Sequence, residues 1–316
     1  MSFRAFFQTP LPDVAIEIDH GHVAAARLVW RGGQAVVAAH AQEALPAGAI
    51  VPALASLNIA DVPAVAKVVG RVLAELGQPA RVALVVPDTV AKVSLLKLEK
   101  VPAKAADLLE IVRWQVRKTA PFPIEQAVLS ISPAATAGDG SAEMLVSLAR
   151  ADVIQQYEQA CEMAGAHAGL VDIASFSVLN SILAGEGRPS GDWLLVHITD
   201  TYLTLAVMRD QSLLFFRHRG EEAEGTLADL IHQTAMYYED RLHGGGFARV
   251  LIAGGARLPG GAENVRRGLE ERLGIGVESV DPRHAAALVD RIIASPELLD
   301  VLAPLVGMLR RDGRVA

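Results

Sequence analysis

Two stretches, Ala80-Arg81-Val82-Ala83-Leu84-Val85 and Ala248-Arg249-Val250-Leu251-Ile252-Ala253, are nearly alike although they lie far apart in the chain. After the arginine each is apolar throughout, which is typical of a strand buried on both faces of a sheet. The chain therefore contains an internal repeat, and the segments that precede each stretch show how far the repeat extends.

Each copy begins with three apolar runs separated by tight turns, and an amphipathic helix follows before the buried strand. The runs cover residues 14–18, 23–30 and 35–39 in the first copy, and 193–198, 202–208 and 212–216 in the second. The helices are expected at residues 62–76 and 226–242. The repeated order strand, strand, strand, helix, strand resembles the actin and Hsp70 nucleotide-binding fold, which is ribonuclease H-like. We therefore predict a duplicated α/β fold whose two lobes face each other across a cleft.

Composition sets further limits. A chain of 316 residues that is 51% hydrophobic can form two sizeable cores. Neither a membrane span nor a secretory signal is apparent, so we expect a cytoplasmic protein. The single cysteine, Cys161, excludes an intrachain disulfide and is predicted to be a small buried hydrophobic residue. The net charge of −7 argues against general nucleic-acid binding.

An additional module separates the two copies. Its pattern predicts a strand at 92–98, a helix at 105–118 with Leu108, Ile111, Val112 and Val116 on its buried side, strands at 127–132 and 143–148, and a second helix at 151–164. We interpret it as a small α+β domain inserted into the first lobe. The predicted domains are residues 1–86 and 166–190 for the first lobe, 87–165 for the module, 191–300 for the second lobe, and 301–316 for a C-terminal helix that returns to the first lobe.

The module is basic within an acidic chain, because five of the six lysines lie between Lys92 and Lys118. One interpretation is a solvated helix face on which Glu110 and Arg113 pair. The other is a docking face for an acidic partner or for anionic lipid. The spacing of these residues does not decide between them.

The helix that ends at Pro121-Phe122-Pro123, with its flanks over residues 114–129, resembles the corresponding segment of the PilM proteins of type IV pilus assembly. Further similar segments are residues 171–180, Tyr237-Tyr238, residues 254–260 and Asp281-Pro282. PilM proteins are actin-like proteins with a small domain inserted at this place, as in the cell-division protein FtsA. The resemblance extends from about residue 14 to about residue 310.

The resemblance implies a nucleotide site, in which the first hairpin turn of each lobe offers a carboxylate and main-chain amides to the phosphates. The residues at these positions are Asp19 and Gly21 in the first turn, Thr199, Asp200 and Thr201 in the second, and Gly254 and Gly255 after the second buried strand. The glycine pair is either a remnant of adenosine binding or a tight turn only.

This chain departs from the family pattern at both turns. The first turn lacks the hydroxyl groups of the family loop, and the second has His197 where an aspartate is expected and threonine where glycine is expected. Magnesium prefers oxygen ligands, so imidazole is a poor replacement. Two lost phosphate contacts, at about 1.5–3 kcal/mol each, weaken binding about 100-fold or more. We therefore predict a degenerate cleft in which ATP and Mg²⁺ are not required, no residue is catalytic, and hydrolysis does not occur.

Three histidines, His20, His22 and His197, are expected on turns that face this cleft. We interpret them as ordinary turn histidines, and no metal site is predicted.

In the family, the groove between the first lobe and the inserted module binds the extended cytoplasmic N-terminal peptide of the inner-membrane protein PilN. The resemblance therefore implies a scaffold at the cytoplasmic face of the inner membrane, with a PilN-like partner and the pilus motor ATPase as a further partner. Strand addition and apolar pockets would bind such a peptide. The candidate partner-binding residues are Lys92, Lys97, Arg113 and Arg117.

Two alternatives from other classes remain open. The first is an active actin-like ATPase or sugar-kinase-like enzyme, which requires magnesium-dependent turnover that His197 argues against. The second is the cytoplasmic domain of an L-type protein of type II secretion, which is expected to continue into a membrane span, whereas this sequence stops at Ala316.

Overall fold

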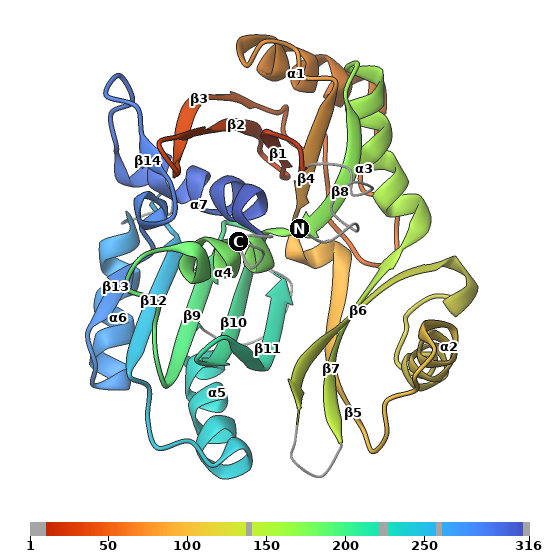
Figure 1. The fold of residues 1–316 in the computed structure, drawn as a ribbon, viewed down its shortest axis with the longest axis vertical. Helices are drawn as coiled ribbons and strands as arrows, with labels where there is room; N and C mark the ends of the chain where they lie inside the picture. Colours follow the sequence, from red (N-terminus) through yellow and green to blue (C-terminus); the bar gives the residue numbers. More distant parts are fainter. Residues whose placement is uncertain (1–10, 137–140, 221–226, 257–260, 312–316) are drawn as a thin grey trace.

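The structure is a computed structural model that describes residues 11–136, 141–220, 227–256 and 261–311. Three sheets make up its framework, and Figure 1 shows one above the other two, which lie side by side. The predicted turns at 137–140 and 259–260, and Thr226 at the start of a predicted helix, lie outside the described residues.

The first lobe is built on a six-stranded sheet of order β14-β3-β2-β1-β4-β8. Its strands are β1 (Val14–Ile18), β2 (His22–Arg31), β3 (Gln34–Ala44), β4 (Arg81–Val86), β8 (His167–Ile173) and β14 (Ala287–Leu288). Strand β1 pairs antiparallel with β2 and parallel with β4, and β4 pairs parallel with β8. Helices α1 (Val62–Glu75) and α3 (Ala151–Met163) bury their apolar sides together with one face of this sheet.

The second lobe repeats this arrangement on a five-stranded sheet of order β11-β10-β9-β12-β13. Its elements are β9 (Asp192–Ile198), β10 (Tyr202–Arg209), β11 (Ser212–Gly220), α5 (Leu227–Leu242), β12 (Arg249–Gly254), α6 (Gly261–Leu273) and β13 (Val277–Ser279). The two similar stretches of sequence are β4 and β12, and each pairs parallel with the first strand of its lobe. The predicted duplicated, two-lobed fold is confirmed. The repeat also includes one more helix and one more strand, α3 and β8 in the first lobe and α6 and β13 in the second.

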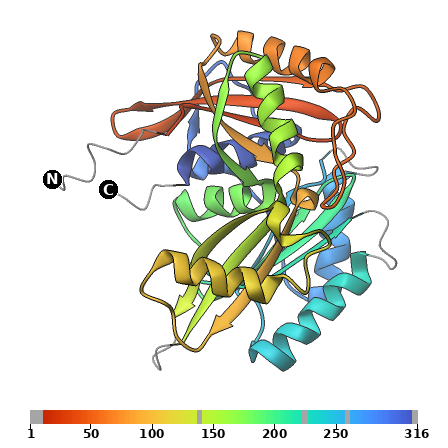
Figure 2. The same cartoon turned by 90° about the vertical axis from the view of Figure 1, so that its right-hand side faces the viewer.

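The inserted module is a three-stranded antiparallel sheet of order β5-β7-β6 with one helix. Its elements are β5 (Ala91–Leu98), α2 (Ala105–Val116), β6 (Ala127–Thr136) and β7 (Ala142–Arg150). Helix α2 covers one face of the sheet, as Figure 2 shows, and buries Val112 and Val116 against Val146 and Leu148. Ile111 was also expected on the buried side of this helix. It is exposed instead, because it lies at the margin of the helix face that contacts the sheet.

The end of the module differs from the prediction. Helix α3 was assigned to the module, yet Tyr157 and Cys161 lie fully buried in the core that α1 shares with the first sheet. The module therefore ends near Arg150 rather than at residue 165. Burial raises the pKa of the Cys161 thiol to about 12, so this cysteine is confirmed as a buried apolar residue.

Two helices cross between the lobes, and Figure 1 shows them at the centre of the molecule. Helix α4 (Ala174–Ala184) follows β8 of the first lobe but packs Val178 and Leu179 on the sheet of the second. Helix α7 (Pro296–Arg310) follows β14 of the first lobe and packs Leu302 and Leu305 on the sheet of that lobe, while Ala303 joins the core of the second. Both helices thus take part in the contact between the lobes. No helix in the described part of the chain is both long and apolar enough to cross a bilayer.

Helices α4 and α7 touch closely at Gly307. A Cβ atom at this position would lie 1.7 Å from the Ser177 carbonyl oxygen and 2.7 Å from the Ser181 nitrogen. Both of these atoms belong to the backbone, so neither can move without shifting the helix. Glycine at position 307 therefore sets the distance between the two crossing helices.

We expect Gly307→Ala to destabilise the protein by about 1–3 kcal/mol or more, because the new methyl group overpacks the helix contact. Gly268→Ala is the matched control, since Gly268 also lies within a helix but an added Cβ there meets nothing within 4 Å. The control should be neutral or slightly stabilising. Chemical denaturation of both variants measures the difference, and equal stability would contradict the close contact.

Candidate functional site

A cleft lies where the first hairpin turns of the two lobes meet, beside β12 and α7. Its cavity is about 180 Å³. The lining residues include Glu17, Asp19, His20, Gly21, His22, His197, Thr199, Asp200, Gly254, Gly255 and Asp300. Six of the seven residues expected at a nucleotide site line this cavity. The seventh, Thr201, lines a neighbouring pocket and hydrogen-bonds through its backbone nitrogen to Thr199 Oγ1, so it supports the turn.

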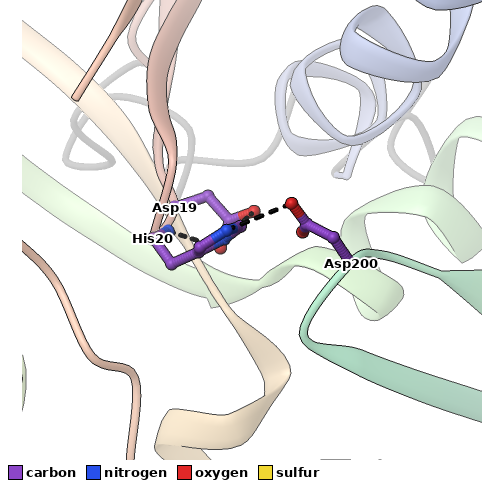
Figure 3. A group of neighbouring side chains, drawn as sticks. All are labelled: Asp19, His20 and Asp200. Carbon is purple, nitrogen blue, oxygen red and sulfur yellow. Dashed lines mark hydrogen bonds and ion pairs between the residues drawn. The ribbon is translucent and has the colours of Figure 1, made fainter. Parts of the chain in front are cut away.

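The first turn holds Asp19 and His20 close to Asp200 of the second turn, as Figure 3 shows. Asp19 is only 7% exposed, and its Oδ1 accepts a hydrogen bond from the His20 backbone nitrogen at 2.8 Å. Burial opposes ionisation of Asp19, but its interactions with His20 and His22 lower the pKa of its carboxyl. The nearby Asp19, and to a smaller extent Asp200, raise the pKa of His20. His20 Nε2 lies 3.1 Å from Asp200 Oδ2, so this contact joins the two lobes.

In the second lobe, His197 occupies the place where an aspartate was expected. The residue is 5% exposed, its Nδ1 lies 2.8 Å from Ser175 Oγ, and its ring meets the Tyr202 ring edge-on. One nitrogen of His197 is thus engaged in a contact with α4 rather than facing the cleft. The sequence indicated this replacement but gave no sign of the serine partner.

Behind His197 lies a buried carboxylate, Asp88, at the point where the chain leaves β4 for the short 3₁₀ helix Asp88–Val90. The side chain is fully buried. Asp88 accepts hydrogen bonds from the Ser175 backbone nitrogen at 2.9 Å, from Ser175 Oγ, and from Thr204 Oγ1 at 2.5 Å. Ser175 lies in the first turn of α4, where a negative charge is favourable, and Thr204 lies on β10 of the second lobe. Asp88 therefore connects the first lobe, helix α4 and the second lobe.

The glycine pair after β12 has a structural explanation. At Gly254, φ is +75° and a Cβ atom would lie 1.9 Å from the Ile198 carbonyl oxygen on the neighbouring strand. Asp300 of α7 also accepts hydrogen bonds from the backbone nitrogens of Gly254 and Ala256, at 3.1 and 3.0 Å. The close approach of β9 and β12 is by itself sufficient to require glycine at position 254. Asp300 was not expected in the cleft, although it is an acidic residue within the otherwise apolar residues 298–309 of α7.

The charged side chains of the cleft are mainly acidic. Among the described residues that line it are four carboxylates, Glu17, Asp19, Asp200 and Asp300, together with three histidines, and no lysine or arginine. Such a lining favours cations and repels polyanions.

A second and larger hollow lies between the module and the crossing helix α4. This groove has a volume of about 600 Å³. Its lining combines the uncovered face of the module sheet, including Ser130, Ser132, Leu145 and Ser147, with Val86, Asp172, Phe176, Leu179 and Asn180 of the first lobe, Met208 and Leu213 of the second, and Arg311. Strand β6 forms an edge of the module sheet and pairs only with β7 among the described strands.

The groove is neutral apart from one ion pair. Asp172 Oδ2 lies 3.1 Å from a guanidinium nitrogen of Arg311. Burial raises the pKa of Asp172 to about 6, and the charge of Arg311 opposes this rise. The pKa of Asp172 in the folded chain exceeds the usual value of about 3.9. Ionisation of Asp172 therefore lowers the free energy of unfolding as pH rises from about 4 to about 6.

The four basic residues proposed for partner binding do not line this groove. Lys92 donates through Nζ to the Thr119 carbonyl oxygen at 2.6 Å, near the end of α2. Arg113 and Arg117 are exposed at α2, on the opposite side of the module sheet from the groove. Lys97 is exposed on β5 and stands opposite Glu143 of β7. A role of these four residues in binding a partner therefore remains a prediction, and it would concern a surface other than the groove.

The fold and the cleft together define the chain as a protein of the actin-like ATPase fold. A family model described as type IV pilus assembly protein PilM matches residues 15–240. This match covers more than half of the sequence, so the chain belongs to the PilM family.

Several solved structures are similar to this chain. The structure titled PilM-PilN type IV pilus biogenesis complex is similar with a TM-score of 0.77 and 20% identity, over 96% of this chain and 99% of the other. A protein from Bacteroides thetaiotaomicron with an actin-like ATPase fold and unknown function is similar with a TM-score of 0.47 and 10% identity, over 84% of this chain and 89% of the other. The ethanolamine utilization protein EutJ from Carboxydothermus hydrogenoformans is similar with a TM-score of 0.47 and 9% identity, over 97% of this chain and 93% of the other. A search of curated protein sequences found no match.

The Asp88 network predicts a large effect of a small substitution. Asp88→Ala removes the acceptor that three buried donors share, so we expect a loss of about 3 kcal/mol or more in the free energy of unfolding. Asp61→Ala is the control, because Asp61 also accepts from a backbone nitrogen at a helix start but is exposed, and its loss costs about 1 kcal/mol. Urea denaturation measures both values, and a loss at Asp88 no larger than at Asp61 would refute the role given to this carboxylate.

Proposed function

We propose that this protein is a scaffold of type IV pilus machinery, or of a related secretion or competence system. In this proposal it binds the cytoplasmic N-terminal peptide of a PilN-like inner-membrane protein and is thereby held at the cytoplasmic face of the inner membrane. The pilus motor ATPase is a further proposed partner. The observation that carries the proposal is the groove between the first lobe and the module, in a chain of the PilM family.

The shape of the groove supports binding of an extended peptide. Its volume of about 600 Å³ falls within the range of about 300–1,000 Å³ that is usual for ligand sites. Strand β6 offers unpaired backbone groups at its edge, to which a peptide can add as a further strand. The exposed Ser130 and Ser132 alternate along this strand on the groove side, while Phe176 and Leu179 provide an apolar wall.

We further propose that the nucleotide cleft is degenerate and that the protein is not an ATPase. Its cavity of about 180 Å³ is small for a nucleotide, and its carboxylates repel a triphosphate. His197, which replaces the expected aspartate, has its Nδ1 beside Ser175. The amides of Gly254 and Ala256 are already bonded to Asp300. These residues do not fit ATP with magnesium, and neither ligand is required for the proposed scaffold role.

Peptide binding can be tested with a synthetic peptide that has the sequence of the cytoplasmic N-terminus of the proposed PilN-like partner. We expect Ser130→Trp to weaken binding at least about tenfold in fluorescence anisotropy, because the indole fills the groove without disturbing the core. The double variant Arg113→Glu and Arg117→Glu changes the other side of the module and should bind normally. Normal binding by Ser130→Trp with weaker binding by the double variant would place the peptide on α2. Equal binding by the unchanged protein and both variants would show that the peptide binds neither surface.

Nucleotide chemistry is tested on the same purified chain with ATP and Mg²⁺. We expect phosphate release at the rate of the protein-free control and a weak heat of binding in calorimetry, since His197 replaces the aspartate expected at the end of β9 and the first turn has no hydroxyl group. Asp19→Ala serves as the comparison and should give the same rate. Turnover that requires magnesium and is lost in Asp19→Ala would establish the alternative of an active ATPase.

A further inference from the structure

The Asp19, His20 and Asp200 side chains form a group that spans the cleft from both lobes. One ligand atom from each of them lies within 4.8 Å of the other two. Figure 3 shows Asp19 and His20 on the first turn and the carboxylate of Asp200 directed toward the imidazole from the second. We propose that these three side chains bind one divalent transition-metal ion, of the zinc class, directly and without a nucleotide.

The distances fit two ligands of a single ion. Zinc lies about 2.0–2.2 Å from imidazole nitrogen and carboxylate oxygen, so neighbouring ligand atoms of a tetrahedral or octahedral site are about 2.8–3.6 Å apart. The distance between His20 Nε2 and Asp200 Oδ2 is 3.1 Å, within that range. Asp19 Oδ2 lies 3.6 Å from Nδ1, the other nitrogen of the His20 ring, so its carboxylate would have to rotate toward Nε2 to reach the same ion.

The surroundings also favour a cation. His20 Nδ1 and His22 Nε2 are buried, and neither has a hydrogen-bond partner. Glu17 and Asp300 add two more carboxylates to the lining, which contains no lysine or arginine among its described residues. A bound divalent ion would neutralise part of this negative charge.

The kind of ion follows from the donor set. One imidazole and two carboxylates suit zinc, cobalt or nickel, whereas magnesium prefers oxygen ligands only. The ion would join the turn between β1 and β2 to the turn between β9 and β10, and would therefore hold the two lobes together. This site is independent of the proposed peptide groove, which lies on the module.

The site can be tested by titrating chelator-treated full-length protein with Zn²⁺ in a calorimeter, and with Co²⁺ while recording its visible absorption. We expect one ion per chain, and at least about tenfold weaker binding in both His20→Ala and Asp200→Asn. His167→Gln is the matched control, because His167 also lies near a carboxylate, 3.9 Å from Glu162, but both are exposed on the first lobe away from the cleft. The control should bind as the unchanged protein does.

A second measurement separates a metal site from a direct ion pair. Zn²⁺ should raise the unfolding temperature of the unchanged chain and of His167→Gln, but not of Asp200→Asn, whose substitution lies at an exposed turn. Equal zinc affinity in the unchanged protein and His20→Ala, or an equal thermal shift in Asp200→Asn, would show that His20 and Asp200 form only an ion pair and would overturn the proposal. Circular dichroism confirms that each variant is folded.

Discussion

The buried carboxylate of Asp88 is the interaction on which the arrangement of the two lobes depends. An ionised group in an apolar interior is unfavourable unless donors surround it, and here the donors come from Ser175 of α4 and Thr204 of β10. Those donors stay in place only while β4, α4 and the second lobe keep their relative positions. The crossing of α4 and α7, with its close contact at Gly307, fixes the same arrangement through packing.

A fixed arrangement of the two lobes would suit the proposed role of this actin-like fold as a scaffold. In the proposed role, the groove must present a constant surface to a peptide, and it is bordered by α4, which the Asp88 network anchors. A cleft that opens and closes with nucleotide would move that helix. The occupied amides of Gly254 and Ala256 and the engagement of His197 are consistent with a cleft that has become part of the lobe contact.

Much of the fold was accessible from the sequence, because the stretches that form the buried strands β4 and β12 share the start Ala-Arg-Val and continue with apolar residues, and tight turns separate the strands before them. Six of the seven residues expected at the cleft also line it, since each lies at a turn or at the end of a strand. The assignment of α3 to the module failed because an apolar helix face does not reveal which core it joins. Asp88, Ser175 and Asp300 were missed because their roles depend on contacts across more than 80, 20 and 40 residues.

The central claim is that the two lobes are locked together and do not respond to nucleotide. Spin labels at Glu75→Cys on α1 and Glu271→Cys on α6, both exposed helix positions, allow the distance between the lobes to be measured by pulsed electron resonance. The account predicts one narrow distance distribution that is the same with and without ATP and Mg²⁺. A shift of several ångströms, or a second population that appears with the nucleotide, would contradict it.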